Sequence, residues 1–263
     1  MFADLELARR LERTEGLAGA SFVEARGGVA GWEQIGGAYA MFDGPESPLT
    51  QTFCLGMFEP ATEPVLQRIE TYFETRNAPV HHEVCPQAGV GLLQMLAGRG
   101  YVPYELSSVL FLDLAERRRE PVLNPDLTIR IAGNRDSDVY AKAAAVGWSE
   151  AGDVAHLVAD LARVMFAAAG YSGFIVEKGG QAIATGGLVI HDRVALLAGA
   201  STIPDARGQG AQRAVLTTRL QFAADAGCDL AMTVAEPGGA SQRNAERHGF
   251  RIAYTRTKWR RGS

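Results

Sequence analysis

The stretch from Ser201 to Arg213 reads STIPDARGQGAQR and decides how the rest of the chain is interpreted. An apolar run typical of a strand ends in it, a proline follows, and helical spacing of apolar residues begins directly afterwards. Gly208 and Gly210 let the backbone approach a bound group closely. Successive backbone N–H groups at the start of a helix bind anions, and Arg207 adds a full positive charge. We therefore expect a pyrophosphate-binding turn here.

The segments around this turn predict a mixed α+β fold. In chain order, the expected elements are a strand over 127–131, helices over 136–150 and 154–169, strands over 173–177, 181–191 and 193–202, a helix over 211–226, a strand over 228–235, a helix over 241–248 and a strand over 250–259. The turns at 178–180 and 191–192 are short, which favours an antiparallel sheet before the glycine-rich turn. The expected architecture is a largely antiparallel sheet flanked by helices.

The N-terminal half repeats the later part of this order. Its expected elements are a strand over 51–58, a helix over 62–76, a strand over 80–85, a helix over 90–99 and a strand over 105–114. Glu59-Pro60 stands where Ile203-Pro204 does, and Gly100-Tyr101 stands where Gly249-Phe250 does. A charged run with two prolines at 115–126 separates the halves. We therefore predict two copies of one fold, at residues 1–115 and 126–263.

The C-terminal half resembles the acyltransferase domains of the GNAT superfamily, which use coenzyme A. In that family a strand ending in x-x-Val-x-Pro leads to Arg/Gln-x-x-Gly-x-Gly/Ala at the start of the main helix. The runs Ala200–Pro204 and Arg207–Gly210 follow this pattern, and Gly249-Phe250 occupies the place of the usual Gly-Phe. With the repeat, the resemblance implies tandem GNAT-like domains of α+β (mixed α/β) class, each with a splayed, largely antiparallel sheet.

The resemblance also implies the ligands: acetyl-CoA as cosubstrate, an amine of a small molecule or peptide as acceptor, and no metal. Strand residues before the turn would pair with the pantetheine arm through their backbone groups, as another strand would. The turn itself would hold the pyrophosphate. The implied cofactor-binding residues are Ala200, Ser201, Thr202, Arg207, Gly208, Gln209, Gly210, Ala211, Gln212 and Asn244.

Two positions depart from the family pattern. Gln212 stands where the family prefers Gly or Ala, so its side chain must point away from the phosphates or contact them. Ala245 stands four residues before Gly249, where the family usually carries the tyrosine thought to protonate the leaving thiolate. The usual general acid is therefore missing from this chain.

The candidate catalytic residues follow from their positions in the expected fold. Glu236 follows a buried strand and is our candidate general base, although a solvated loop carboxylate would look the same. For the acid, Tyr254 or Ser241 could substitute, and Tyr254 also fits half-buried packing. His248 reads mainly as a helix C-terminal residue favoured by the dipole. Trp148 fits either the wall of an acceptor pocket or the core.

The N-terminal half lacks the glycine-rich turn. After Pro60 the chain reads Ala61-Thr62-Glu63-Pro64, and the acid would repel a pyrophosphate. We therefore interpret this half as a degenerate copy that completes the sheet and walls the acceptor site.

Composition excludes several other classes. With 47% apolar residues, 21% charged residues and a net charge of −4, the chain carries no basic surface for nucleic acid. The amphipathic N-terminus and the lack of an 18-residue apolar run predict a cytoplasmic protein without a membrane segment. His81 and His82 share one strand and face opposite sides, which argues against a metal site with Cys85. The basic end, Arg256 to Arg261, reads as a solvated terminus.

We therefore predict an N-acetyltransferase that works by direct attack of an amine on the thioester. The alternative of a different class is a non-catalytic acyl-CoA-binding regulatory module, because Ala245 replaces the usual tyrosine. A dinucleotide-binding enzyme fits poorly, since that site needs a parallel βαβ unit. The acceptor, the acyl length and the formation of a homodimer stay open.

Overall fold

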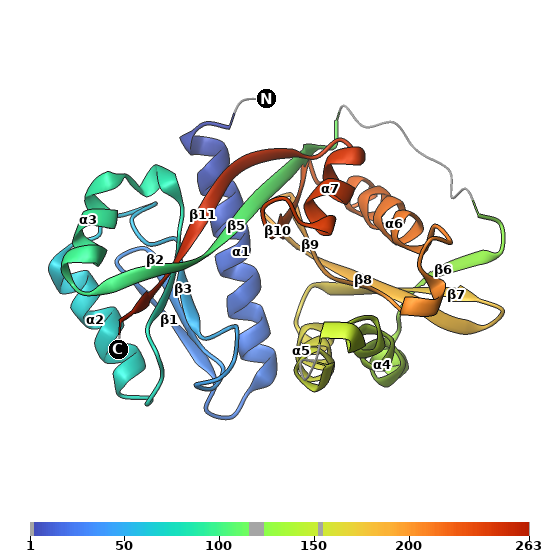
Figure 1. Cartoon of the computed structure of the whole chain (residues 1–263), viewed down its shortest axis with the longest axis horizontal. Helices are drawn as coiled ribbons and strands as arrows, with labels where there is room; N and C mark the ends of the chain where they lie inside the picture. The colour runs from blue at the N-terminus through green and yellow to red at the C-terminus, as the bar shows by residue number, and fades with distance from the viewer. Residues whose placement is uncertain (1–2, 116–123, 152–154, 263) are drawn as a thin grey trace. The chain divides into compact units, whose positions relative to one another are not determined.

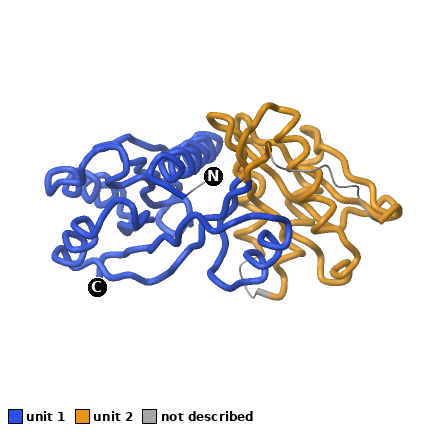
Figure 2. Tube along the Cα trace, turned by 90° about the horizontal axis from the view of Figure 1, so that it is seen from above, with its two compact units in different colours: residues 1–112, 232–263 blue, residues 113–231 orange. Residues whose placement is uncertain are grey.

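The computed structural model describes residues 3–115, 124–151 and 155–262. The chain divides into two compact units: unit 1 comprises Met1–Leu112 and Met232–Ser263, and unit 2 comprises Asp113–Ala231 (Figure 2). Each unit contains a sheet and helices, so the predicted α+β class is confirmed. Most of the interruption predicted at 115–126 lies outside the described residues.

Unit 1 is built around a mixed sheet with the strand order β1-β2-β3-β4-β11-β5 (Figure 1). Its elements are α1 (Leu5–Arg26), β1 (Gly31–Ile35), β2 (Ala38–Phe42), β3 (Gln51–Phe53), α2 (Glu63–Glu74), β4 (His81–Val84), α3 (Val90–Gly98), β5 (Tyr101–Asp113), α7 (Ala240–Arg247) and β11 (Arg251–Arg261). The β3–β4 pair is parallel, whereas the β1–β2, β2–β3, β4–β11 and β11–β5 pairs are antiparallel. Strand β10 (Leu230–Ala235) begins in unit 2 and ends in unit 1.

Strand β2 shows how helices cover both faces of this sheet. Successive side chains of a strand point to opposite faces. Tyr39 and Met41 pack in one apolar cluster with Val23 of α1, whereas Ala40 and Phe42 belong to the cluster formed with α2 and α3. All five β2 residues are buried as a result.

The last strand of the chain completes the sheet of unit 1. β11 lies between β4 and β5 and is antiparallel to both. Arg256 is fully buried and Trp259 is 8% exposed, so the prediction of a solvated basic terminus is wrong for these two residues. The compact units therefore divide the chain differently from the predicted copies, 1–115 and 126–263. The duplication of element order in these two copies stays a prediction.

Unit 2 contains the antiparallel meander expected before the glycine-rich turn. Its elements are β6 (Leu127–Ile131), α4 (Ser137–Gly147), α5 (Ala155–Ala167), β7 (Tyr171–Lys178), β8 (Gln181–His191), β9 (Val194–Thr202) and α6 (Ala211–Asp225), with short 3₁₀ turns at Asn134–Asp136, Ser149–Ala151 and Pro204–Ala206. The strands are ordered β9-β8-β7-β6, each antiparallel to its neighbour.

Two adjacent residues of β7 reveal the layers of unit 2. The Phe174 ring meets Phe222 of α6 edge-on, with 5.5 Å between ring centroids. The next residue, Ile175, packs instead in the cluster of α4 and α5 that contains Tyr140 and Ala162. Helix α6 therefore covers one face of the sheet, and α4 with α5 covers the other (Figure 1).

Candidate functional site

The turn from β9 into α6 has the open geometry that an anion site needs. Gly208 and Gly210 adopt φ of 77° and 86°, a region that favours glycine, and no heavy atom lies within 4 Å of a Cβ placed on either residue. Gly210 is the N-cap of α6 and provides no side-chain cap. The first amides of α6 therefore receive no side-chain cap from Gly210, and they lie at the positive end of the helix dipole.

Side chains from three segments fix this turn. Thr202 Oγ1 donates a hydrogen bond to Gln212 Oε1 at 3.1 Å, so the Gln212 side chain is directed toward the end of β9. Lys178 Nζ donates to Gln209 Oε1 at 2.7 Å, and Asn124 Nδ2 donates to the Gln209 carbonyl at 3.0 Å. Lys178, the last residue of β7, and Asn124, which precedes β6, were not predicted as site residues, because both are distant from the turn in the sequence.

Arg207 already has partners on α4 and the turn that follows it. Its guanidinium forms an ion pair with Glu150 and donates to the Gly147 carbonyl at 3.2 Å. The ionic partners remain accessible, with 49% of the Arg207 side chain and 62% of the Glu150 side chain exposed. An exposed pair of this kind contributes about 0–1 kcal/mol, so a bound anion could compete with it.

Strand β9 carries a bulge beside the turn. Ala198 pairs with Gly187 and Ser201 pairs with Thr185, so Gly199 and Ala200 oppose the single residue between Thr185 and Gly187 on β8. Gly199 adopts φ of 63°, which favours glycine at this point. Because a bulge takes its extra residue out of the ladder, backbone groups of this Gly199–Ala200 bulge become available to a ligand.

Ser201 is held against α4. Its Oγ donates to the Ala144 carbonyl at 2.9 Å, and the side chain is buried. A Cβ placed on Gly147 would lie 1.8 Å from Ser201 Oγ, so only glycine permits this close approach. The hydroxyl therefore positions β9, and the Ser201 backbone is the part left for the predicted pantetheine contacts.

Three predicted site residues belong to unit 1. Glu236 is exposed just after β10, and its carbonyl accepts a hydrogen bond from Gly239 N at 2.9 Å. Asn244 is half-buried on α7, where its carbonyl accepts from His248 Nδ1 at 2.8 Å. The latter contact agrees with the helix-terminal interpretation of His248. The proposed catalytic role of Glu236 and the cofactor contact of Asn244 stay predictions.

Tyr254, the third, belongs to a buried cluster of charged residues. Its hydroxyl donates to Glu12 Oε1 at 2.8 Å. The Arg256 guanidinium lies 2.8 Å from Glu15 Oε2, 3.1 Å from Glu83 Oε2 and 3.5 Å from Glu12 Oε1. Burial raises the pKa of Glu12 to about 7, an effect larger than the opposing attraction of Arg256. These contacts give Tyr254 a structural role, and its role as an acid stays a prediction.

The substitution Glu12→Gln is expected to flatten the pH dependence of stability. The pKa of Glu12 rises from 4.5 to about 7 in the folded protein. The protonated carboxyl therefore stabilises the folded protein fully below pH 4.5, and this contribution is lost as the pH rises through 7. A shift of this size corresponds to about 3 kcal/mol. Gln cannot ionise and can still accept from Tyr254. Urea unfolding between pH 4 and 8 should therefore show a flatter profile, with the variant more stable than the native protein at pH 8.

The exposed Glu59→Gln exchange is the control for this experiment. Its profile should follow that of the native protein. Parallel pH profiles for the native protein and Glu12→Gln would contradict the assignment of a neutral buried carboxyl to Glu12.

The equivalent helix start in the N-terminal half is closed by its own side chains. Thr62 is the N-cap of α2, and its Oγ1 accepts a hydrogen bond from Val65 N at 3.4 Å. Glu63 occupies the first turn and forms an ion pair with Arg99. An anion would therefore meet a capped amide and a carboxylate here, whereas the Gly210 end of α6 presents neither.

Side chains also cover the backbone at Gly56, which follows β3. Gly56 occupies the position that the repeat equates with Ala200, and a Cβ there would lie 3.2 Å from both Ala88 Cβ and Leu92 Cδ2. Side chains of unit 1 therefore pack directly against this glycine. Both observations support the interpretation of a degenerate N-terminal copy.

His81 and His82 have separate surroundings. The His81 ring lies against Tyr104, with 5.5 Å between centroids, whereas His82 is buried and its Nδ1 lies 2.5 Å from Thr52 Oγ1. Burial lowers the pKa of His82 to about 3, so this imidazole stays neutral. Within the described residues, no group of three or more His, Cys, Asp or Glu side chains is placed to hold a metal. No helix in that part of the chain is long and apolar enough to span a bilayer.

Comparisons with known proteins identify what the chain is similar to. Residues 142–250 match the family model described as Acetyltransferase (GNAT) family. A GCN5-related N-acetyltransferase from Kribbella flavida superposes with a TM-score of 0.67 at 19% identity, over 95% of this chain and 96% of that one. A GCN5-related N-acetyltransferase from Sphaerobacter thermophilus gives a TM-score of 0.60 at 15% identity, over 85% and 76% of the two chains. No curated protein sequence matches.

A tandem arrangement has a solved counterpart. A tandem GNAT protein from the clavulanic acid biosynthesis pathway superposes with a TM-score of 0.59 at 12% identity, over 86% of this chain and 83% of that one. Identities this low establish the fold alone. The tandem GNAT-like fold predicted from the sequence is thereby confirmed.

Proposed function

Because the chain carries a domain of the GNAT acetyltransferase family, we propose that the protein transfers an acetyl group from acetyl-CoA to a primary amine of a small molecule or peptide. The observation that supports this most is the uncapped start of α6, which follows two glycines in open space. An anion such as a pyrophosphate gains both the helix dipole and direct N–H hydrogen bonds at such a place.

In this proposal the cofactor lies along the segment from the β9 bulge to the start of α6. Residues Arg207 to Gln212 hold the pyrophosphate, and Lys178, which contacts Gln209, supplies a second positive charge to the same turn. Backbone groups of Ala200, Ser201 and Thr202 pair with the amides of the pantetheine arm. Asn244 contacts the arm or the thioester.

The reaction begins when the neutral amine attacks the thioester carbonyl. A carbon–nitrogen bond forms, and a backbone N–H of the β9 bulge stabilises the negative charge on the oxygen. The carbon–sulfur bond then breaks, the amine proton passes to Glu236 directly or through water, and the thiolate takes a proton. We assign this second proton to Tyr254. The products are an N-acetyl amide and the free thiol of coenzyme A.

A non-catalytic acyl-CoA-binding module is the second candidate. Ala245 is 5% exposed on α7 and occupies the position of the family's usual tyrosine. Its methyl group cannot donate a proton to a leaving thiolate. A regulatory module of this kind would bind acetyl-CoA and release no thiol.

Turnover distinguishes the two candidates. Free thiol is measured with acetyl-CoA and a panel of primary amines, for the native protein and for Glu236→Gln. We expect amine-dependent thiol release, and a kcat for Glu236→Gln that is about 10²–10⁴-fold lower, as for loss of a general base. The Kd for acetyl-CoA should not change, because the variant keeps the turn intact.

The control for the base is Glu246→Gln, which neutralises an exposed carboxylate on α7. Its kcat should equal that of the native protein. Binding of acetyl-CoA without thiol release from any amine would favour the regulatory module. An unchanged kcat for Glu236→Gln would exclude Glu236 as the base.

A further inference from the structure

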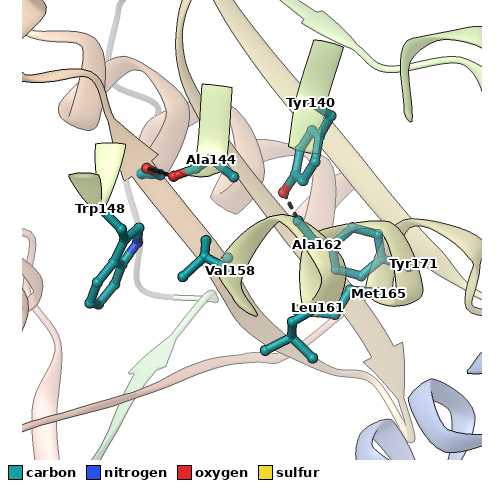
Figure 3. A pocket seen from close by; sticks show the side chains of 10 residues that line it. Tyr140, Ala144, Trp148, Val158, Leu161, Ala162, Met165 and Tyr171 are labelled. Carbon is teal, nitrogen blue, oxygen red and sulfur yellow. Dashed lines mark hydrogen bonds between the residues drawn. The ribbon is translucent and has the colours of Figure 1, made fainter. Parts of the chain in front are cut away.

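Unit 2 contains a partly open pocket of about 220 Å³ between α4, α5 and β9 (Figure 3). Helix α5 supplies an apolar wall through Val158, Leu161, Ala162 and Met165. Trp148 lies at the end of α4 on another wall and is 49% exposed, so its indole borders solvent. The described residues that line the pocket include no charged side chain.

The pocket adjoins the strand segment assigned to the thioester. Gly199 and Ser201 of β9 form part of its lining, and Ala200 of the β9 bulge lies between them. The Ser201 hydroxyl is already bonded to the Ala144 carbonyl, so this wall adds little polarity. A group in the pocket would therefore stand next to the acyl carbon of the proposed cofactor.

One neutral polar spot interrupts the apolar surface. The hydroxyl groups of Tyr140 and Tyr171 lie 2.8 Å apart, and both side chains line the pocket (Figure 3). A Cβ on Gly199 would lie 3.0 Å from the Tyr171 hydroxyl, so the glycine lets the tyrosine reach the strand. Burial raises the pKa of both tyrosines, which consequently stay uncharged.

A buried cation behind this spot disfavours a second positive charge. Arg219 is 3% exposed, and its Nη1 donates to the carbonyls of Gly187 at 3.0 Å and Ala198 at 3.3 Å. Its charge interacts with Tyr140 and Tyr171. A cationic group of a ligand would be repelled there and would lose its hydration without gaining a carboxylate.

The size of the pocket fits one ring. An apolar cavity of about 150 Å³ binds benzene, so a pocket of 220 Å³ has room for a phenyl or indole ring. The exposed indole of Trp148 adds an aromatic surface at the rim, which favours a second ring by offset or edge contact.

We propose that this pocket binds the uncharged apolar ring of the acceptor, so that the substrates are primary amines carrying one such ring on a short chain. The ring lies between α5 and β9, and the amine points toward the β9 bulge. The assignment rests on the proposed acetyl transfer, and it excludes acceptors whose second group is a cation, a carboxylate or a phosphate.

A matched pair of amines tests the specificity. We expect kcat/KM for 2-phenylethylamine to exceed that for ethylamine by about 10- to 100-fold, because the free energy gained by burying an aromatic ring corresponds to a factor of this size. Ala162→Phe places a ring in the pocket and should reduce the ratio to about one, since a filled pocket cannot accept a second ring. Ala167→Phe adds the same ring to an exposed position of the same helix and should preserve the ratio.

A binding measurement separates this inference from acetyl transfer and does not depend on the folding of Ala162→Phe. Protein carrying ¹³C-methyl methionine is titrated with 2-phenylethylamine and with ethylamine, and Met165→Leu identifies the Met165 signal. The inference predicts that the aromatic amine alone shifts this signal. If acetyl-CoA binds and neither amine shifts it, or if the two amines react equally well, the pocket assignment is overturned and acetyl transfer stands. A shift without acetyl-CoA binding would overturn acetyl transfer and retain the pocket.

Discussion

Gly210→Glu should weaken acetyl-CoA binding by at least about 100-fold, since two charge-assisted hydrogen bonds of roughly 1.5–3 kcal/mol each would be lost. Gly210 is the N-cap of α6, and a Cβ added to it would have no heavy atom within 4 Å. The new carboxylate would stand beside the amides that receive the pyrophosphate, accept their hydrogen bonds and repel the ligand. Isothermal titration with acetyl-CoA measures the change.

Gly227→Glu is the matched control for strain and charge. Gly227 follows the other end of α6, adopts φ of 82° and likewise has no heavy atom within 4 Å of an added Cβ. Acetyl-CoA binding should be retained in this variant. Equal losses in Gly210→Glu and Gly227→Glu would show that backbone strain, rather than the anion site, causes the effect.

Removing the partner of Arg207 should have the opposite sign. Glu150→Gln neutralises the carboxylate that pairs with Arg207 and frees the guanidinium for the pyrophosphate. Exposed pairs contribute about 0.2–1 kcal/mol, so the affinity should rise by about 1.4- to fivefold. Gly210→Glu and Glu150→Gln therefore test the turn in opposite directions, since the first should lower and the second should raise the affinity for acetyl-CoA.

Arg256→Met is expected to destabilise the protein by about 3–5 kcal/mol, the cost of removing one partner from a buried ionic group. Three buried or nearly buried carboxylates, those of Glu12, Glu15 and Glu83, would lose their shared guanidinium. Total stabilities are about 5–15 kcal/mol, so unit 1 could lose its fold. Urea unfolding of purified protein measures the change.

Arg261→Met provides the surface control. Arg261 pairs with Glu74 at 2.9 Å while both side chains remain about half exposed, so its loss should cost no more than about 1 kcal/mol. A cost below about 1 kcal/mol for Arg256→Met would contradict the described cluster.

Local signals in the sequence predicted the part of unit 2 that leads to the site. The Gly179-Gly180 turn and the flanking apolar residues predicted the strand over 181–191, and β8 has these bounds. The glycine-rich turn predicted the start of α6 at Ala211. Both features depend on residues that are close together in the chain, so spacing alone could reveal them.

Long-range pairing was out of reach of the sequence. β11 inserts between β4 and β5, and the cations along it read as a solvated end because their carboxylate partners lie on α1 and β4. The hairpin of β1 and β2 was also missed. All of β2 is buried, so the alternation that marks a half-exposed strand is absent there.

The candidate site shows the same limit. The residues of the turn were predicted, but Lys178 and Asn124 reach it from other segments. A glycine inside a strand was the available signal for the β9 bulge, because Gly199 interrupts an otherwise apolar run. Gln212 could not be oriented before its bond to Thr202 was known.

Isothermal titration of the native protein with acetyl-CoA tests the central claim most directly. The account predicts saturable binding with one cofactor per chain, because α6 begins with an open turn whereas α2 is capped by Thr62. Two cofactors per chain would contradict the degenerate N-terminal copy. No binding at all would contradict the proposed acetyl-CoA site.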